Sequence, residues 1–401
     1  MNYIHQHIWN FSTVGGVKRV NLDSGADLIH LEQLDQKLWT ALSCPVYGLE
    51  IDHKTLSLID TDNDGQIRVP EMLAAVKWMT SVLKNPDDLL KQESTFPLAA
   101  IDDSTDEGRT LLASAKIILR NLNNEQATVL TVEETSDIKK IFAASRFNGD
   151  GVITEDSIDS DALRVVFNNI IIYAGSVTDL GGKPGISVEV LQQFVEASTH
   201  YLAWHAKAEN DNTILPFGQL TEAAYASYRA IKAKVDDYFI RCRLAAFDPQ
   251  STVALNLSVA RVEAISDKDL STSLDEIATY PLAKVEAGKP LPLTAGINPA
   301  WEKAISTFKE LVAQQQFADK ISITETEWLS LENLFTGFVE WQSEKVGAMV
   351  EPLGIENIKQ ILSGSAIPSL TELIEQDKAL EHEASSIILV DKMVRYYRDL
   401  Y

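Results

Sequence analysis

Four carboxylates lie within the twelve residues of one segment of this 401-residue chain. The segment runs Asp60-Thr-Asp-Asn-Asp-Gly-Gln-Ile-Arg-Val-Pro-Glu71, so its acids occupy the first, third, fifth and twelfth positions. Carboxylates placed this closely repel one another unless a cation neutralises them. A hard cation suits such a set, because calcium takes six to eight oxygens at about 2.3–2.6 Å. The spacing therefore predicts a calcium site.

The segment resembles the calcium-binding loop of the EF-hand family and matches its pattern at every constrained position. The ligands that the resemblance implies are the side chains of Asp60, Asp62 and Asp64, the backbone carbonyl of Gln66 and both carboxylate oxygens of Glu71. Gly65 stands where the loop turns sharply with positive φ, a conformation that a Cβ opposes. We expect one Ca2+ site; Mg2+ is the alternative ion, although a bidentate Glu favours the larger one.

The flanking residues agree with a helix-loop-helix unit. Asp52 can cap a short helix before the loop, and Pro70 suits the first turn of the helix after it, where its missing N–H costs nothing. That second helix is expected to bury Met72, Val76 and Met79. Arg68, at the ninth position of the loop, departs from the usual oxygen-bearing side chain, and its charge is expected to weaken calcium binding.

Residues 146–157 form a second, degenerate copy of the motif. The interior positions are kept by Asn148, Asp150, Gly151 and Ile153. Arg146 and Ser157, however, replace the first and last carboxylates, so about half of the charge and the bidentate ligand are lost. We predict that this loop keeps the EF-hand conformation, with calcium binding weak or absent.

EF-hands usually pair through the eighth loop position, so each loop needs a partner. Residues 179–190 would place Ile186 opposite Ile153. A similar separation suggests that residues 94–105, with Ile101, pair with the calcium loop through Ile67. Neither expected partner carries the ligands to bind metal.

The rest of the chain follows a mainly α pattern with short β segments. Gly15-Gly16 between two β-rich runs predicts an N-terminal β-hairpin. Helical periodicity begins at Ala26, with leucines 28, 31, 34, 38 and 42 on one face. Further helices are expected at residues 52–59, 70–84, 106–121, 133–145, 159–173, 188–207, 219–246, 299–314, 325–345 and 368–380.

A polar, turn-prone stretch at residues 208–215 suggests a domain boundary. We predict an EF-hand-containing helical domain over residues 1–211 and an α-helical C-terminal domain over residues 212–401. The helix at 219–246 carries a heptad-like seam that includes Tyr228, Val235 and Cys242. Packing of this helix within its own domain is favoured over an intermolecular coiled coil.

Composition limits the possible partners. The chain has 58 acidic and 35 basic residues and a formal net charge of -23. Such an acidic surface repels nucleic acid and anionic lipid and favours cations. The two cysteines, Cys44 and Cys242, make neither a zinc motif nor a disulfide framework. Together with the lack of a long apolar run, this predicts a cytoplasmic protein without membrane or nucleic-acid partners.

No catalytic motif stands out, and we therefore name no catalytic residue. The sequence favours a calcium-binding structural or interaction protein, whose protein partner it does not identify, and within this class a permanent structural site over a sensor. The alternative is an enzyme of unrecognised class with an ancillary structural calcium site.

Overall fold

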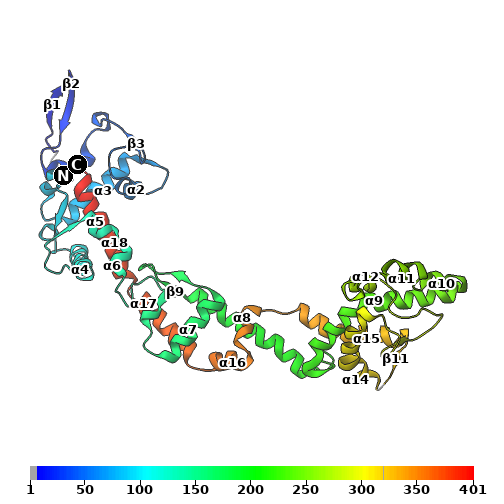
Figure 1. Cartoon of the computed structure of the whole chain (residues 1–401). Helices are drawn as coiled ribbons and strands as arrows, with labels where there is room; N and C mark the ends of the chain where they lie inside the picture. Colours follow the sequence, from blue (N-terminus) through cyan, green and yellow to red (C-terminus); the bar gives the residue numbers. More distant parts are fainter. Residues whose placement is uncertain (1–6, 319) are drawn as a thin grey trace, which may run out of the picture. The chain divides into compact units, whose positions relative to one another are not determined.

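The structure is a computed structural model that describes residues 7–318 and 320–401. Helices make up most of the described chain, and the strands are short and antiparallel (Figure 1). The predicted mainly α fold, with an N-terminal hairpin and a helical C-terminal region, is confirmed. The chain forms two compact units, one comprising Met1–Val195 with Lys359–Tyr401 and the other Glu196–Ile358.

Each unit has its own set of helices. Those of the first unit are α1 (Gly25–Ile29), α2 (His53–Ile59), α3 (Val69–Val82), α4 (Asp106–Asn121), α5 (Val132–Ser136), α6 (Ile138–Phe142), α7 (Asp161–Ala174), α17 (Ala366–Lys378) and α18 (Glu381–Asp399). Those of the second are α9 (Thr221–Phe247), α10 (Thr252–Leu255), α11 (Val259–Ser266), α12 (Leu274–Ala278), α13 (Glu302–Phe308), α14 (Gln314–Phe317) and α15 (Glu325–Ser343). The bounds of the two units fall within α8 (Val188–Asn210) and α16 (Ile355–Ser363).

The strands form small antiparallel sheets. They are β1 (Asn10–Val14), β2 (Val17–Asn21), β3 (Ser43–Pro45), β4 (Gln66–Arg68), β5 (Thr95–Pro97), β6 (Val129–Thr131), β7 (Ile153–Thr154), β8 (Val177–Thr178), β9 (Pro184–Ile186), β10 (Leu291–Pro292) and β11 (Ser322–Ile323). The N-terminal hairpin joins β1 to β2 through Gly15 and Gly16, whose φ angles of 59° and 83° suit a tight turn.

Four of the sheets share one design. In each of the pairs β3–β4, β5–β6, β9–β7 and β10–β11, one apolar residue or cysteine lies opposite an apolar residue of the other strand. These opposed pairs are Cys44–Ile67, Phe96–Leu130, Ile186–Ile153 and Leu291–Ile323. All except Cys44 are buried, so each sheet ties two loops together through a small core contact.

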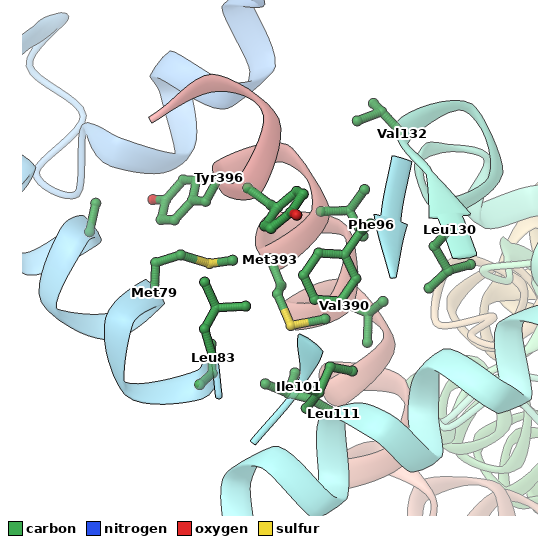
Figure 2. Packing of buried hydrophobic residues seen from close by; sticks show 14 of the residues in the cluster. Met79, Leu83, Phe96, Ile101, Leu111, Leu130, Val132, Val390, Met393 and Tyr396 are labelled. Atoms are coloured by element: carbon green, nitrogen blue, oxygen red, sulfur yellow. The ribbon is translucent and has the colours of Figure 1, made fainter. Parts of the chain in front are cut away.

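The core of the first unit forms around α18. Its residues Val390, Met393 and Tyr396 are at most 1% exposed. Figure 2 shows these side chains pointing into the space between α3, with Met79, and the β5–β6 pair, with Phe96. The C-terminal helix therefore supplies a large part of the apolar surface that α3, α4 and the β5–β6 pair bury.

The core of the second unit follows the predicted seam of α9. The seam residues are Ala224, Tyr228, Ile231, Val235, Tyr238, Cys242 and Ala245, and all are buried. They pack on α13 and α15 of the same unit, as predicted. In the same unit, the rings of Trp204 and Trp341 stack 4.0 Å apart. Each indole N–H donates to the other residue's backbone carbonyl, at 2.7 and 2.8 Å.

The predicted helix after Ala26 is wrong. The structure has the short α1 followed by two 3-10 turns, Leu31–Gln33 and Gln36–Leu38. Leu34 is extended, and the Asp35 carboxylate accepts the N–H of Lys37 at 3.0 Å, which starts a new turn instead of continuing a helix. Leucines 28, 31 and 34 are nevertheless buried.

The units differ from the predicted division into residues 1–211 and 212–401. Residues 359–401 belong with the N-terminal part, and residues 196–358 form a separate unit inserted between the two. The physical reason is the apolar face of α18, which is buried in the first core. The polar composition of residues 208–215 gives no information on whether a later segment packs against the N-terminal part.

Among the described residues, no helix is both long enough and apolar enough to cross a bilayer.

Candidate metal centre

Local sequence signals place the acidic loop between α2 and α3. Asp52 caps α2, since its carboxylate accepts the N–H groups of Lys54 at 2.8 Å and Thr55 at 3.4 Å. Asp60 ends α2, and Pro70 lies in the first turn of α3. The predicted cap of α2 and the predicted place of Pro70 are therefore confirmed, and the acidic loop runs from the end of α2 into the first turn of α3.

Three of the five predicted ligands converge. Asp60, Asp62 and Glu71 each bring one carboxylate oxygen to within 4.8 Å of the others. Asp60 is only 6% exposed and accepts the N–H of Asp64 at 3.2 Å and that of Gly65 at 2.9 Å. These bonds fold the loop around the first carboxylate, as the twelve-residue spacing requires.

Glu71 closes the loop from its far end. One of its carboxylate oxygens accepts the backbone N–H of Thr61 at 2.7 Å, and the other accepts that of Arg68 at 2.9 Å. The twelfth position is thus held against the second position while it also caps α3. Through these two hydrogen bonds, Glu71 couples the conformation of the loop to the start of α3.

Asp64 stands apart from the convergent group. Its carboxylate lies 2.5 Å from the guanidinium of Arg68, which is also 3.7 Å from Asp62. Arg68, the unusual residue at the ninth loop position, therefore forms an ion pair with the carboxylate of Asp64 at the fifth position. The side-chain oxygen of Gln66 accepts from the Ser43 hydroxyl at 3.0 Å, so only its backbone carbonyl remains for the predicted role.

Hydrogen bonds lower the pKa of two loop carboxyl groups. For Glu71 the backbone N–H of Arg68 is the largest cause, and partial burial opposes it. For Asp64 the Arg68 side chain is the largest cause of the lowered pKa. Both groups are consequently charged at neutral pH, the state that cation binding requires.

The residues present fit a calcium ion. The convergent donors are all oxygens, the ligand type that hard cations prefer. Gly65, with φ of 82°, lies open to solvent and makes the sharp turn that the spacing predicts. Asn63 also takes a left-handed φ of 56°, a conformation that Asn adopts more readily than most residues.

The acidic loop of residues 60–71 pairs with an unexpected partner. Ile67 of β4 lies opposite Cys44 of β3, not Ile101. Ile101 instead bridges to Leu83, and β5 of residues 94–105 pairs with β6. The predicted pairing of the loop with residues 94–105 is therefore wrong; an Ile at a suitable separation does not specify a strand partner.

The second predicted pairing is confirmed. Ile153 of the degenerate loop lies directly opposite Ile186 of β9, and both are fully buried. At the twelfth position, the Ser157 hydroxyl accepts the N–H of Thr154 at 3.3 Å and donates to the Arg146 carbonyl at 2.8 Å. Ser157 thus closes residues 146–157 as Glu71 closes residues 60–71, with a hydroxyl in place of a carboxylate.

A residue that the sequence did not reveal sits in the degenerate loop. Asp377 of α17 is fully buried, and its carboxylate accepts the N–H groups of Asn148 at 2.7 Å, Gly149 at 3.2 Å and Gly151 at 2.7 Å. Like the Asp60 carboxylate in residues 60–71, it accepts the backbone N–H of the glycine at the sixth loop position. No local pattern could have found it, because the contact joins residues more than 200 positions apart.

The helix-start geometry of Glu71 recurs at two other glutamates of the described chain. Glu134 accepts the N–H of Thr131, and Glu327 that of Thr324, each at 2.9 Å directly after a short strand. The Thr-x-x-Glu pattern of both sites could have predicted these caps. Neither segment has an acidic group of three around it among the described residues.

Comparison with known proteins adds no assignment. No protein-family model matches the chain, and no curated protein or solved structure resembles it at a significant level.

Proposed function

We propose that this chain is a calcium-binding structural protein whose ion is held by residues 60–71. The observation that carries the proposal is the convergence of Asp60, Asp62 and Glu71 within 4.8 Å, inside a loop closed at both ends. Asp64 joins them when it exchanges the Arg68 guanidinium for the ion, and the Gln66 carbonyl completes the protein ligands.

The ion would act as a staple for contacts made by α2. The Asp52 carboxylate at the start of α2 accepts from Arg395 at 2.9 Å and Arg398 at 2.7 Å of α18. At the other end of α2, the Tyr396 hydroxyl donates to the Leu58 carbonyl at 2.6 Å. Because calcium fixes the end of α2 against the start of α3, it also supports the docking of α18 on both helices.

The packing favours a permanent site over a sensor. A sensor hand opens to expose an apolar groove when calcium binds. Here most of the apolar face of α3 is already covered, since Val76, Met79 and Val82 are buried and α18 lies against α3 (Figure 2). Met72, which was expected to be buried as well, is partly buried. Opening the hand would expose this core, and that cost opposes a switching role.

The test compares melting temperatures with calcium and with a chelator. Calcium at about a hundredfold above its Kd adds about 2.7 kcal/mol to the stability of a native state that alone binds it. For a unit of this size, that raises Tm by roughly 5–10 °C. Glu71→Gln removes charge and one strong ligand, so the calcium-dependent rise should shrink or vanish.

Glu134→Gln is the matched control for the helix cap. Glu134 makes the same 2.9 Å bond to a strand-end N–H as Glu71, but outside an acidic loop. The variant should melt lower in both buffers and keep the full calcium-dependent rise. An unaltered rise in Glu71→Gln would place the ion elsewhere and refute the proposal.

A further inference from the structure

The N-terminal hairpin is a two-stranded sheet with open edges. Among the described residues, no further strand pairs with β1 or β2. Four of the five residues of β1 are exposed, and Figure 1 shows the hairpin pointing away from the neighbouring helices. An isolated two-stranded sheet is only marginally stable in water, so a further strand would stabilise it.

The two edges of the hairpin differ in charge. The strand β2 carries two adjacent cations, Lys18 and Arg19. Charged side chains, Lys above all, are a common means by which proteins prevent pairing at an exposed edge. The strand β1 has the sequence Asn-Phe-Ser-Thr-Val and contains neither a charge nor a proline. Strand pairing is therefore opposed at the edge of β2 and allowed at the edge of β1.

The turn determines which backbone groups of β1 point outward. Gly15 and Gly16 make a two-residue turn, and in such a hairpin the residue pair next to the turn exchanges both of its hydrogen bonds. Bonded and non-bonded pairs then alternate along the strands. The N–H and C=O groups of Phe11 and Thr13 consequently point away from β2. They have no backbone partner elsewhere in the described part of the chain.

These outward groups make the edge of β1 complementary to itself. When two β1 strands meet antiparallel around a twofold axis at Ser12, Phe11 of each strand lies opposite Thr13 of the other. Every outward N–H of one strand then meets a C=O of the other. A surface that matches its own copy in this way is what a twofold-symmetric dimer requires.

The charges allow this arrangement and set its strength. The cations of the two copies lie on the outer strands, about 14 Å apart at three strand spacings. That separation exceeds the Debye length of about 8 Å at physiological ionic strength, so their repulsion is screened. The net charge of -23 on each chain opposes association when salt is low. Because a five-residue edge buries far less than the roughly 1,000 Å2 of a stable interface, the association is weak.

We propose that β1 is a self-association edge, through which two copies of this chain form a weak, twofold-symmetric dimer with a continuous sheet of order β2–β1–β1–β2. This interface is independent of the acidic loop, and both of its tests use the full chain in a chelator buffer.

The first test is disulfide formation from single cysteines in a glutathione redox buffer. Ser12→Cys brings two thiols together at the twofold axis, in a non-bonded pair with Cα atoms about 4.5 Å apart, which a disulfide can span. Thr13→Cys is the matched control. Thr13 is the more exposed of the two neighbours, but its copies lie about 8 Å apart across the axis, too far for a disulfide.

We expect Ser12→Cys to form a covalent dimer, whereas Thr13→Cys and the unsubstituted chain, which keeps Cys44 and Cys242, stay monomeric on a non-reducing gel. The contrast isolates the strand register, because random collision would favour the more exposed position. Equal dimer formation by the two variants, or none by Ser12→Cys, would overturn the proposal.

The second test is sedimentation equilibrium at about 0.01 and 1 M salt, where the Debye lengths are about 30 and 3 Å. Backbone pairing at β1 predicts tighter association at high salt, because the repulsion between the acidic chains is screened. Thr13→Pro removes one outward N–H at an edge position that accepts proline and should abolish the dimer, whereas Thr13→Val should keep it. Association that weakens with salt would instead indicate contacts between Lys18 or Arg19 and the acidic surface, and would refute pairing through β1.

Discussion

Asp377 is expected to hold the loop of residues 146–157 closed. Its buried carboxylate accepts three backbone N–H groups of residues 148–151 at 2.7, 3.2 and 2.7 Å. Asp377→Asn keeps the shape of the side chain but replaces one acceptor oxygen with an NH2 group that faces a donor. The change leaves at least one buried N–H without a partner and removes the charge from the other bonds.

The expected cost follows from these bonds. Hydrogen bonds to charged groups contribute about 1.5–3 kcal/mol each, and an unpaired buried donor costs about 1–3 kcal/mol. Since such terms are not additive, we expect a total of about 3–5 kcal/mol. That corresponds to a fall in Tm of roughly 6–20 °C for a unit of 150–250 residues.

The assay is urea denaturation followed by far-ultraviolet circular dichroism, with Glu375→Gln as control. Glu375 lies on the same helix, loses the same charge on substitution, and is exposed. The control should stay within about 0.5 kcal/mol of the unsubstituted protein. An Asp377→Asn protein as stable as the control would refute the role given to this carboxylate.

Three further predictions concern α18 and the calcium loop. Burial would raise the pKa of Asp52, but the hydrogen bond from Arg398 and the charge of Arg395 lower this pKa below its ordinary value of 3.8. The stabilising effect of the carboxylate is therefore present above about pH 4 and is lost as the pH falls through the lowered pKa. In urea denaturation, Asp52→Asn should be about 1–3 kcal/mol less stable than the unsubstituted protein at pH 7, and the two stabilities should converge in acid. Met393→Ala, at a fully buried position, should cost about 2–5 kcal/mol by the same assay, and a smaller loss would mean that α18 is not central to the core. Arg68→Gln releases the fifth-position carboxylate and should tighten calcium binding several-fold in a calorimetric titration, whereas weaker binding would contradict the competition between Arg68 and the ion.

Local patterns predicted the elements whose causes are local. Gly15-Gly16 fixed the hairpin turn, and Asp52 and Pro70 marked the helix ends around the acidic loop. The apolar seam of α9 predicted its buried face. In each case the physical cause, a turn conformation, a cap or a helical period, lies within a few residues.

Contacts between residues far apart in the chain could not be predicted from the sequence. Asp377 and α18 act through contacts with residues hundreds of positions earlier, and nothing next to them indicates which loop they will meet. Leucines 28, 31 and 34 are buried without forming the predicted helix, because Asp35 starts a new turn, and leucines 38 and 42 beyond it are exposed. The choice of Cys44 over Ile101 as the partner of Ile67 likewise depends on how the surrounding chain packs.

Calcium binding at residues 60–71 is tested most directly by isothermal titration of the full, chelator-treated chain. We expect one site per chain, because only this loop keeps both its first and last carboxylates, with affinity at least about tenfold lower in Glu71→Gln, equivalent to roughly 1.4 kcal/mol. Ser157→Ala, at the matching place in residues 146–157, should leave the titration unchanged. A second site of equal affinity, no binding, or an unaltered titration of Glu71→Gln would contradict the assignment of the ion to this loop.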